Sequence, residues 1–232
     1  MIELHAWPTP NGIKISVMLE ECGLPYKSVA VNIRDGDQFK PEFLKISPNN
    51  KIPALVDPDG PGGKPISIFE SGAILIYLAE KTGKVPSKDP VGRYQAFQWL
   101  MFQVGGIGPM FGQFNHFKTY AADPIPYALN RYYKESDRLV GVLDRRLAEA
   151  EYMAGDYSIA DIATWPWIRG YEKRVTLDAF PNAKRWFKAI EERPAVKRGV
   201  QFLSAEREIS KSAGVTDKVR EVYFGNTQHQ RR

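Results

Sequence analysis

Two short stretches of this 232-residue chain contain residues suited to binding a small peptide. The first is Ile52-Pro53, where proline opens an apolar run that we interpret as a strand. Proline is tolerated at the first residue or the edge of a strand, and it leaves the backbone beside it unpaired. If the Ile52–Pro53 bond is cis, the turn points the N–H and C=O groups of Ile52 outward. An extended peptide can then pair with Ile52 as an added strand would.

The second stretch is Glu70-Ser71, which follows a short predicted strand and begins an apolar helix. The N-terminus of a helix presents unpaired N–H groups and a positive potential, so it is suited to a carboxylate. We expect the Ser71 hydroxyl to donate to that carboxylate and the Glu70 side chain to pair with an ammonium group. Alone, Ile52-Pro53 could be a plain strand start and Glu70 an ordinary acid at a helix start. Together they predict a pocket for a small peptide with an α-amino-acid head.

The single cysteine and the three histidines indicate little chemistry of their own. One cysteine excludes an internal disulfide and a Cys-x-x-Cys redox pair. Cys22 lies near the end of a predicted amphipathic helix with no histidine nearby in sequence, so we interpret it as a small buried hydrophobe. His5, His116 and His229 lack the spacing of metal ligands. We therefore predict no metal site.

Residues 1–83 predict an α/β domain built on a four-stranded mixed sheet with helices on both faces. A helical pattern over residues 13–22 separates the first two strands, which implies a right-handed parallel crossover. A tight loop makes the last two strands an antiparallel hairpin. The expected strands are residues 2–6, 26–33, the run opened by Pro53, and 66–68; the other helical patterns are 39–44 and the segment from Ser71.

The character of the sequence changes after a linker at residues 84–90. Strand patterns disappear, and residues 91–208 are expected to form an all-helical domain. The helix expected over 91–120 must bend at its glycine- and proline-rich middle. Further helices are expected near 181–192 and 194–208, before a polar and weakly patterned tail at 209–232.

The sharpest helix start in the second half is Ser158-Ile-Ala-Asp161. It has the pattern of a capping box with aspartate in place of glutamate, in which Ser158 caps the helix and Asp161 bonds back to it. The helix that follows is very apolar, so we expect it to form the buried axis of this domain. The tryptophans of the second half are interpreted as core, and two other aromatic residues as core or cleft-lining: Trp99, Trp165, Trp167 and Trp186, then Phe111 and Tyr132.

Composition excludes several classes of function. The net charge is +5, but the late basic residues are interleaved with acids, which favours a solvated surface over a nucleic-acid interface. No apolar run approaches the roughly 20 residues that a membrane helix needs. The N-terminus lacks a basic region followed by an apolar stretch, so we expect no secretory signal. A reducing, cytoplasmic location is the simplest interpretation.

In their order and spacing, these motifs resemble the glutathione transferase superfamily. That fold pairs a thioredoxin-like domain with an all-helical domain, and the resemblance covers residues 1 to about 205. Within the superfamily the chain is similar to the bacterial nu class, which is close to the transferase-like domain of a yeast nitrogen-regulatory prion protein. The motifs that carry the class resemblance are Thr9-Pro10-Asn11-Gly12, Asn49-Asn50-Lys51-Ile52-Pro53, Trp99-Leu-Met-Phe-Gln103 and Gly105-Gly106-Ile-Gly108-Pro109.

The resemblance implies a homodimer that binds reduced glutathione or glutathione disulfide. It also implies that bound glutathione reduces small disulfides, with weak transferase or peroxidase activity toward electrophiles. Ile52 then pairs through its backbone with the cysteinyl unit, beside a cis Pro53. Glu70 and Ser71 bind the ammonium and carboxylate groups of the γ-glutamyl unit.

The catalytic positions implied by the resemblance are Thr9 and Asn11, at the start of the first helix. A thiolate there gains from the Asn11 amide, the Thr9 hydroxyl and the positive end of the helix, which lower the pKa of a thiol. Without a ligand, Asn11-Gly12 would simply be a turn and a cap. The resemblance also places Gln38 near the glycyl carboxylate and brings Arg131 over from the helical domain.

Two classes of function remain open from the sequence. One is a glutathione-dependent enzyme, and the other is a non-catalytic binding or regulatory module, since this fold also serves in such proteins. The Glu70-Ser71 pair favours the enzyme, because non-catalytic members often lose it. An oxidoreductase with its own cysteine pair is excluded by the cysteine count. The residues decide neither between reductase and transferase nor which second substrate is used.

Overall fold

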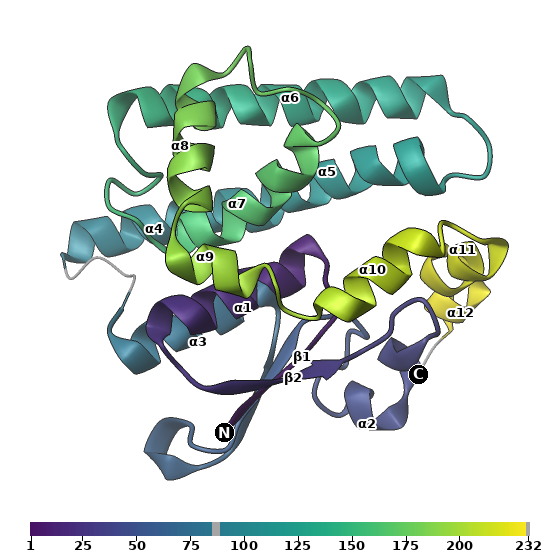
Figure 1. The fold of residues 1–232 in the computed structure, drawn as a ribbon, viewed down its shortest axis with the longest axis horizontal. Helices are drawn as coiled ribbons and strands as arrows, with labels where there is room; N and C mark the ends of the chain where they lie inside the picture. Colours follow the sequence, from purple (N-terminus) through teal and green to yellow (C-terminus); the bar gives the residue numbers. More distant parts are fainter. Residues whose placement is uncertain (85–88, 231–232) are drawn as a thin grey trace.

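A computed structural model describes residues 1–84 and 89–230, which form a mixed sheet with flanking helices and a larger helical part (Figure 1). The sheet strands and the helices between them, through α3 (Ser71–Thr82), lie within the segment 1–83 for which the sequence predicts an α/β domain. Residues 85–88 of the predicted linker lie outside the described residues. Among the described helices, none is both long enough and apolar enough to cross a bilayer.

The sheet has four strands in the order β2-β1-β3-β4, which confirms the predicted mixed sheet. β1 and β2 pair in parallel, whereas β3 pairs antiparallel with both β1 and β4. The strand after Pro53 begins directly at Ala54, as expected for a proline that opens a strand. The strands are β1 (Ile2–Ala6), β2 (Tyr26–Ala30), β3 (Ala54–Asp57) and β4 (Ile66–Phe69); a short turn of helix, η2 (Pro61–Gly63), lies in the hairpin.

Helices cover both faces of this sheet. Neighbouring residues of a strand point to opposite faces, and on β3 Leu55 joins the main core while Ala54 packs in a small cluster with Phe43. The main-core face carries α1 (Pro10–Cys22) and α3 (Ser71–Thr82). The other face carries η1 (Asp37–Phe39) and α2 (Pro41–Leu44), below the sheet in Figure 1. Helix α1 begins three residues earlier than the apolar pattern indicates, with Thr9 as its cap.

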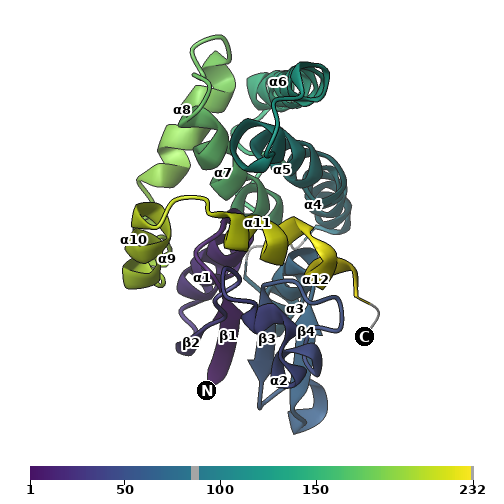
Figure 2. The same ribbon diagram turned by 90° about the vertical axis from the view of Figure 1, so that its right-hand side faces the viewer.

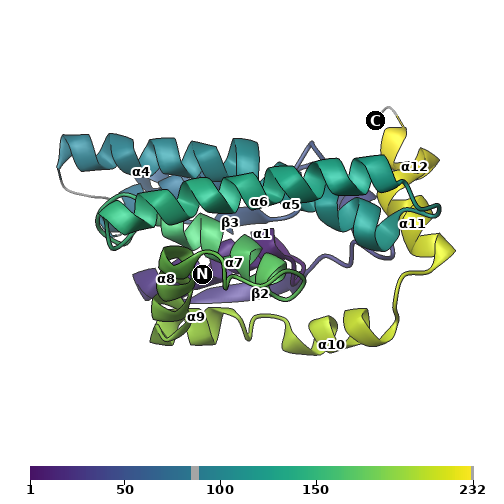
Figure 3. The same cartoon turned by 90° about the horizontal axis from the view of Figure 1, so that it is seen from above.

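The helical part is arranged around α7, which lies among the other helices (Figure 3). The helix expected over 91–120 is interrupted by two π-helical turns, the first of them at the predicted glycine-rich bend. The elements are α4 (Pro90–Phe102), η3 (Gln103–Ile107), α5 (Gly108–Asn115), η4 (His116–Tyr120), α6 (Pro126–Glu149), α7 (Ile159–Glu172), α8 (Pro181–Glu191) and α9 (Pro194–Gly199).

The capping box at the start of α7 is confirmed. The fully buried Asp161 carboxylate accepts from the backbone N–H of Ser158 at 2.9 Å, from that of Met153 at 3.0 Å and from Trp186 Nε1 at 2.7 Å. Burial raises the pKa of Asp161 to about 6, although these donors favour the ionised form. The carboxylate therefore holds the preceding loop and α8 against the start of the central helix.

The chain after α9 differs from the sequence prediction. The helix expected over 194–208 is two helices, because Leu203 adopts a left-handed conformation with φ 45° between them. The boundary expected at 208 falls inside α10, and the tail expected to be polar and weakly patterned contains helices. Its helices are α10 (Ser204–Ser212), α11 (Asp217–Phe224) and α12 (Asn226–His229). Figure 2 shows α11 and α12 crossing from the helical part toward the sheet domain.

Candidate functional site

A cavity of about 590 Å³ lies where the start of α1, the second half of α7 and the C-terminal helices meet. Three of the predicted site residues, Thr9, Asn11 and Ile52, line it. Pro53, Gln38, Glu70, Ser71 and Arg131 are not part of its lining. The remaining wall is aromatic and basic, and it includes Trp7, Arg34, Phe111, Phe114, Tyr120, Trp167, Arg169, Lys173, Arg174, Arg207, Ser210 and Tyr223.

Thr9 and Asn11 are positioned by the first turn of α1. Thr9 caps the helix, and its Oγ1 accepts from the backbone N–H of Gly12 at 3.4 Å. The Asn11 side chain accepts through Oδ1 from Trp167 Nε1 at 3.1 Å. Because the indole uses the oxygen, the Asn11 NH₂ group is the end that remains to donate to a ligand. Trp167 therefore orients Asn11 and lines the cavity, which corrects its interpretation as a plain core residue.

The Ile52–Pro53 peptide bond is cis, as the family resemblance implied. The turn before it is closed by Ser47, whose Oγ donates to the Lys51 carbonyl at 2.8 Å. Asn50 takes a positive φ of 49° in the same turn. Ile52 packs in part on the small cluster beneath the sheet and also lines the cavity. Its backbone lies just before the start of β3, where an extended ligand can pair with it.

Glu70 and Ser71 stand at the junction of β4 and α3. Ser71 is the first helical residue and is 9% exposed, whereas Glu70 is exposed and precedes the helix with φ 70° and ψ 113°. Residues other than glycine rarely adopt this backbone conformation. Ser71 is bonded to Lys14, the neighbour of the cavity residue Ile13, so the junction is connected to the cavity wall through α1.

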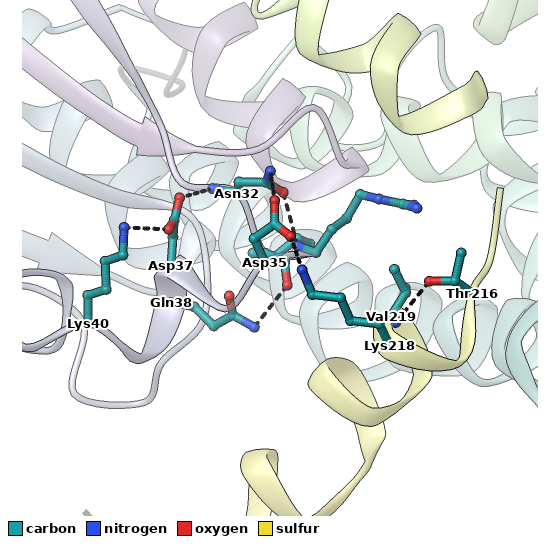
Figure 4. Close-up of polar contacts among 10 residues, drawn as sticks. Asn32, Asp35, Asp37, Gln38, Lys40, Thr216, Lys218 and Val219 are labelled. Atoms are coloured by element: carbon teal, nitrogen blue, oxygen red, sulfur yellow. Dashed lines mark hydrogen bonds and ion pairs between the residues drawn. The ribbon is translucent and has the colours of Figure 1, made fainter. Parts of the chain in front are cut away.

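Gln38 and Arg131 are placed apart from the cavity. Gln38 is 4% exposed, and its Nε2 donates to the Ile33 carbonyl at 3.2 Å (Figure 4). Its Oε1 is buried with no hydrogen-bond partner among the described residues. The glycyl carboxylate of glutathione needs a hydrogen-bond donor. In this conformation the unpartnered atom of Gln38 is Oε1, which can only accept. Arg131 is exposed on α6 and does not reach the cavity of its own chain.

The C-terminal helices cover the side of the cavity next to the loop that carries Gln38, a role the sequence pattern did not reveal. Lys218 of α11 pairs with Asp35 at 2.7 Å, and Thr216 caps α11 through the Val219 N–H (Figure 4). Farther along, Gln228 of α12 accepts from Lys51 Nζ at 2.9 Å. Two polar residues of this tail thus contact polar residues of the sheet domain.

The electrostatic character of the cavity is strongly positive. Among the described residues, five basic ones line it, and none of the lining residues is an aspartate or glutamate. Burial and the neighbouring Arg169 lower the pKa of Arg207, because both disfavour its charged form. Such a wall favours an anionic ligand, because a bound negative charge relieves the repulsion between the cations.

The only cysteine is not part of this site. Cys22 is buried at the other end of α1, where its Sγ lies 3.4 Å from Thr82 Oγ1. Burial raises the pKa of its thiol, the opposite of what a nucleophilic cysteine needs. A thiolate at the cavity must therefore be brought by a ligand. No group of three His, Cys, Asp or Glu side chains among the described residues could hold a metal ion.

The chain belongs to the glutathione S-transferase family. The model of the glutathione S-transferase N-terminal domain matches residues 9–81, and that of the C-terminal domain matches residues 130–194. One relative is the disulfide-bond oxidoreductase YfcG of Escherichia coli strain K12, 52% identical over 209 residues, covering 89% of this chain and 96% of the relative. These findings confirm the family that the sequence motifs indicated.

Solved structures of similar proteins contain glutathione. A glutathione transferase from Pseudomonas putida, with one glutathione disulfide bound per subunit, is 50% identical with a TM-score of 0.84, covering 87% of this chain and 91% of that one. A glutathione transferase from Burkholderia graminis, with two glutathione molecules bound per subunit, is 52% identical with a TM-score of 0.83, covering 86% and 87%. The predicted thioredoxin-like and helical arrangement is thus confirmed.

The strained backbone at Glu70 predicts an unusual stability ranking. A residue other than glycine in such a conformation costs about 1–3 kcal/mol, whereas glycine adopts it freely but gains entropy when unfolded. We expect Glu70→Gly to exceed Glu70→Ala by about 1 kcal/mol in free energy of unfolding, measured by urea denaturation. The matched control is Glu80, exposed inside α3, where the glycine variant should be the less stable by about 1 kcal/mol. If the glycine variant were the less stable one at Glu70 as well as at Glu80, the backbone at Glu70 would not be strained.

Proposed function

We propose that this chain catalyses the reduction of small disulfides by bound glutathione. One observation carries the proposal: Thr9, Asn11 and Ile52 face a common cavity from which the only cysteine is absent. A thiol ligand held by Ile52 would have its sulfur beside the positive end of α1. The relative named a disulfide-bond oxidoreductase, and the similar structures with one glutathione disulfide or two glutathione molecules, support the same chemistry.

The proposed reaction consumes two glutathione molecules for each disulfide. The thiolate of the first attacks one sulfur of the substrate R–S–S–R, forms a mixed disulfide and releases RS⁻, which takes up a proton. The thiolate of the second attacks the glutathionyl sulfur of the mixed disulfide, yielding glutathione disulfide and a second RS⁻. Glutathione is therefore a co-substrate, and no metal takes part.

The proposed roles of the residues follow from their positions. The Asn11 NH₂ group, the Thr9 hydroxyl and the N-terminus of α1 stabilise the glutathione thiolate. Ile52, presented by the cis Pro53, pairs with the cysteinyl backbone, while Glu70 and Ser71 bind the γ-glutamyl ammonium and carboxylate. Gln38 and Arg131 remain proposals that require a rearrangement of their present surroundings.

The test is turnover of 2-hydroxyethyl disulfide with glutathione, run beside conjugation of an aryl halide. We expect strong reduction and weak conjugation. Asn11→Ala should lower kcat by about ten- to hundredfold, because a donor to the developing charge is lost, and it should raise the pKa of the bound thiol while glutathione affinity stays within about twofold. Trp167→Phe should act in the same direction more weakly, since it removes the partner that orients Asn11.

Asn130→Ala, exposed on α6, serves as the control and should leave both rates unchanged. Full activity of Asn11→Ala would remove that residue from the mechanism. Glutathione binding without either activity in the wild type would instead favour the non-catalytic module.

We also propose that the second substrate is anionic. The described part of the lining supports this specificity, because it has five basic residues and no acidic one. A disulfide that carries carboxylates would be attracted to this wall, whereas a neutral disulfide of similar size would gain nothing from it.

Charge-removing substitutions test this specificity. We expect Arg169→Gln or Arg207→Gln to raise KM for 3,3′-dithiodipropionate about fivefold, since a charge contact in such a site is worth about 1 kcal/mol. KM for the neutral 2-hydroxyethyl disulfide should not change. Lys27→Gln, an exposed lysine on β2, should affect neither substrate. Equal effects on both disulfides would show that the arginines act on cavity shape rather than on charge.

A weak glutathione transferase or peroxidase activity is a second candidate. The aromatic part of the wall, with Phe111, Phe114 and Trp167, can accommodate an apolar electrophile beside the same thiolate. The aryl-halide assay above measures the transferase activity of this candidate directly.

We propose a homodimer in the cytoplasm. Four large apolar side chains of β4 and α4 are exposed in the single chain: Phe69, Val91, Tyr94 and Met101. A partner subunit would cover such a surface. Light scattering should give twice the chain mass of 26.3 kDa, and a single-chain mass at micromolar concentration would contradict the dimer. The single cysteine supports a reducing compartment.

A further inference from the structure

A buried lysine connects the proposed glutathione-binding residues to the helical domain. Lys14 of α1 is 2% exposed, and its Nζ donates to Ser71 Oγ at 3.1 Å and to Gln103 Oε1 at 2.7 Å. Ser71 begins α3, and Gln103 begins η3 in the helical part. Burial of a charged amine costs free energy unless the charge is compensated. A lysine at this junction therefore needs a reason beyond packing.

Both partners present an oxygen to this amine. Gln103 is fully buried, and its Oε1 accepts from Lys14, whereas its Nε2 has no hydrogen-bond partner among the described residues. An ammonium group has three donors and no acceptor. Ser71 thus receives a hydrogen bond through its oxygen, and its own hydroxyl proton must point elsewhere.

We propose that Lys14 is a positioning residue of the glutathione site, whose ammonium group holds Ser71 so that the serine hydroxyl donates outward to the α-carboxylate of the γ-glutamyl unit. The inference rests on the proposed function, in which Ser71 binds that carboxylate. A neutral amine could accept the Ser71 proton instead, and the outward donor would be lost. The ammonium group also places a positive charge behind the carboxylate.

The surroundings of Lys14 make its charge sensitive to the ligand. Burial lowers the pKa of Lys14 to about 7, and the Glu70 carboxylate opposes this shift. Those two causes account for the shift in the pKa of Lys14. The elements packed against α1 carry other charged or titratable residues, which are Glu3 and His5 on β1, Glu80 and Lys81 on α3, Asp161, Arg169 and Glu172 on α7, and Lys197 and Arg198 on α9. A bound carboxylate favours the ammonium form, so affinity for it should fall as the pH rises above about 7.

Two peptides separate the carboxylate from the rest of the ligand. S-methylglutathione has a blocked thiol, so sulfur ionisation does not contribute to its pH dependence. The second probe, 4-aminobutanoyl-S-methylcysteinylglycine, keeps the ammonium group and lacks the α-carboxylate. Calorimetric titration of the full chain should show the Kd for S-methylglutathione rising about tenfold from pH 6 to pH 8. The Kd for the second peptide should stay constant.

Substitutions then test the role of the lysine itself. Lys14→Met should weaken S-methylglutathione at pH 6 by about tenfold, abolish the pH dependence, and change the affinity for the second peptide by less than about twofold. Gln103→Glu places a carboxylate beside Lys14 and raises the pKa of the amine, so the loss of affinity should move above pH 8. Lys27→Met, an exposed lysine on β2, should behave as the wild type.

The outcomes distinguish the inference from the proposed function. Equal weakening of both peptides by Lys14→Met would mean that the lysine only joins the two domains, and it would overturn the inference. A pH-independent wild-type Kd for S-methylglutathione would do the same. If Ser71→Ala leaves the affinity for S-methylglutathione unchanged, the proposed binding site itself is wrong. Should Lys14→Met fail to fold, the wild-type profile and the Gln103→Glu shift decide the matter.

Discussion

Helix α1 is held between the two parts of the molecule, and the position of its N-terminus sets the geometry of the candidate site. It packs against β1 and α3 in the sheet domain and against α7 and α9 in the helical part. The contact with α9 is very close, because a Cβ on Gly199 would lie 2.7 Å from Val17 Cα. Ser16 Oγ reinforces this contact by donating to the Gly199 carbonyl at 2.8 Å. With α1 fixed in this way, Asn11 meets Trp167 from a distant segment of the chain, and Thr9 lines the same cavity.

The residues that the sheet domain contributes to the proposed binding site have unusual backbone conformations. A cis bond at Pro53 and a positive φ at Glu70 stand at the starts of β3 and α3, two neighbouring elements of one fold. A positive φ at a residue other than glycine persists where the surrounding structure determines it. Glu70 directly follows β4, and the chain turns sharply there into α3, whose first residue, Ser71, is bonded to Lys14.

The chemistry of the family is consistent with a chain that supplies no sulfur of its own. Cys22 is buried and the pKa of its thiol is raised. The cavity itself offers hydrogen-bond donors, the N-terminus of α1 and basic side chains, but no cysteine. Part of this wall comes from the C-terminal helices through Arg207, Ser210 and Tyr223. The tail thus contributes to the site from the far end of the chain, and its contacts with Asp35 and Lys51 keep it over the sheet domain.

Local sequence patterns determined the family, the mixed sheet, the capping box at Ser158 and the importance of Pro53, because periodicity, turn residues and caps act over a few positions. They could not place Trp167 beside Asn11, separated by 156 positions, or Lys14 beside Ser71 and Gln103. They also missed the break at Leu203 and the course of the tail, because the pattern of a helix shows which of its faces is apolar but not which distant segment covers that face. These features were decided by tertiary structure, since each depends on which distant segments pack together.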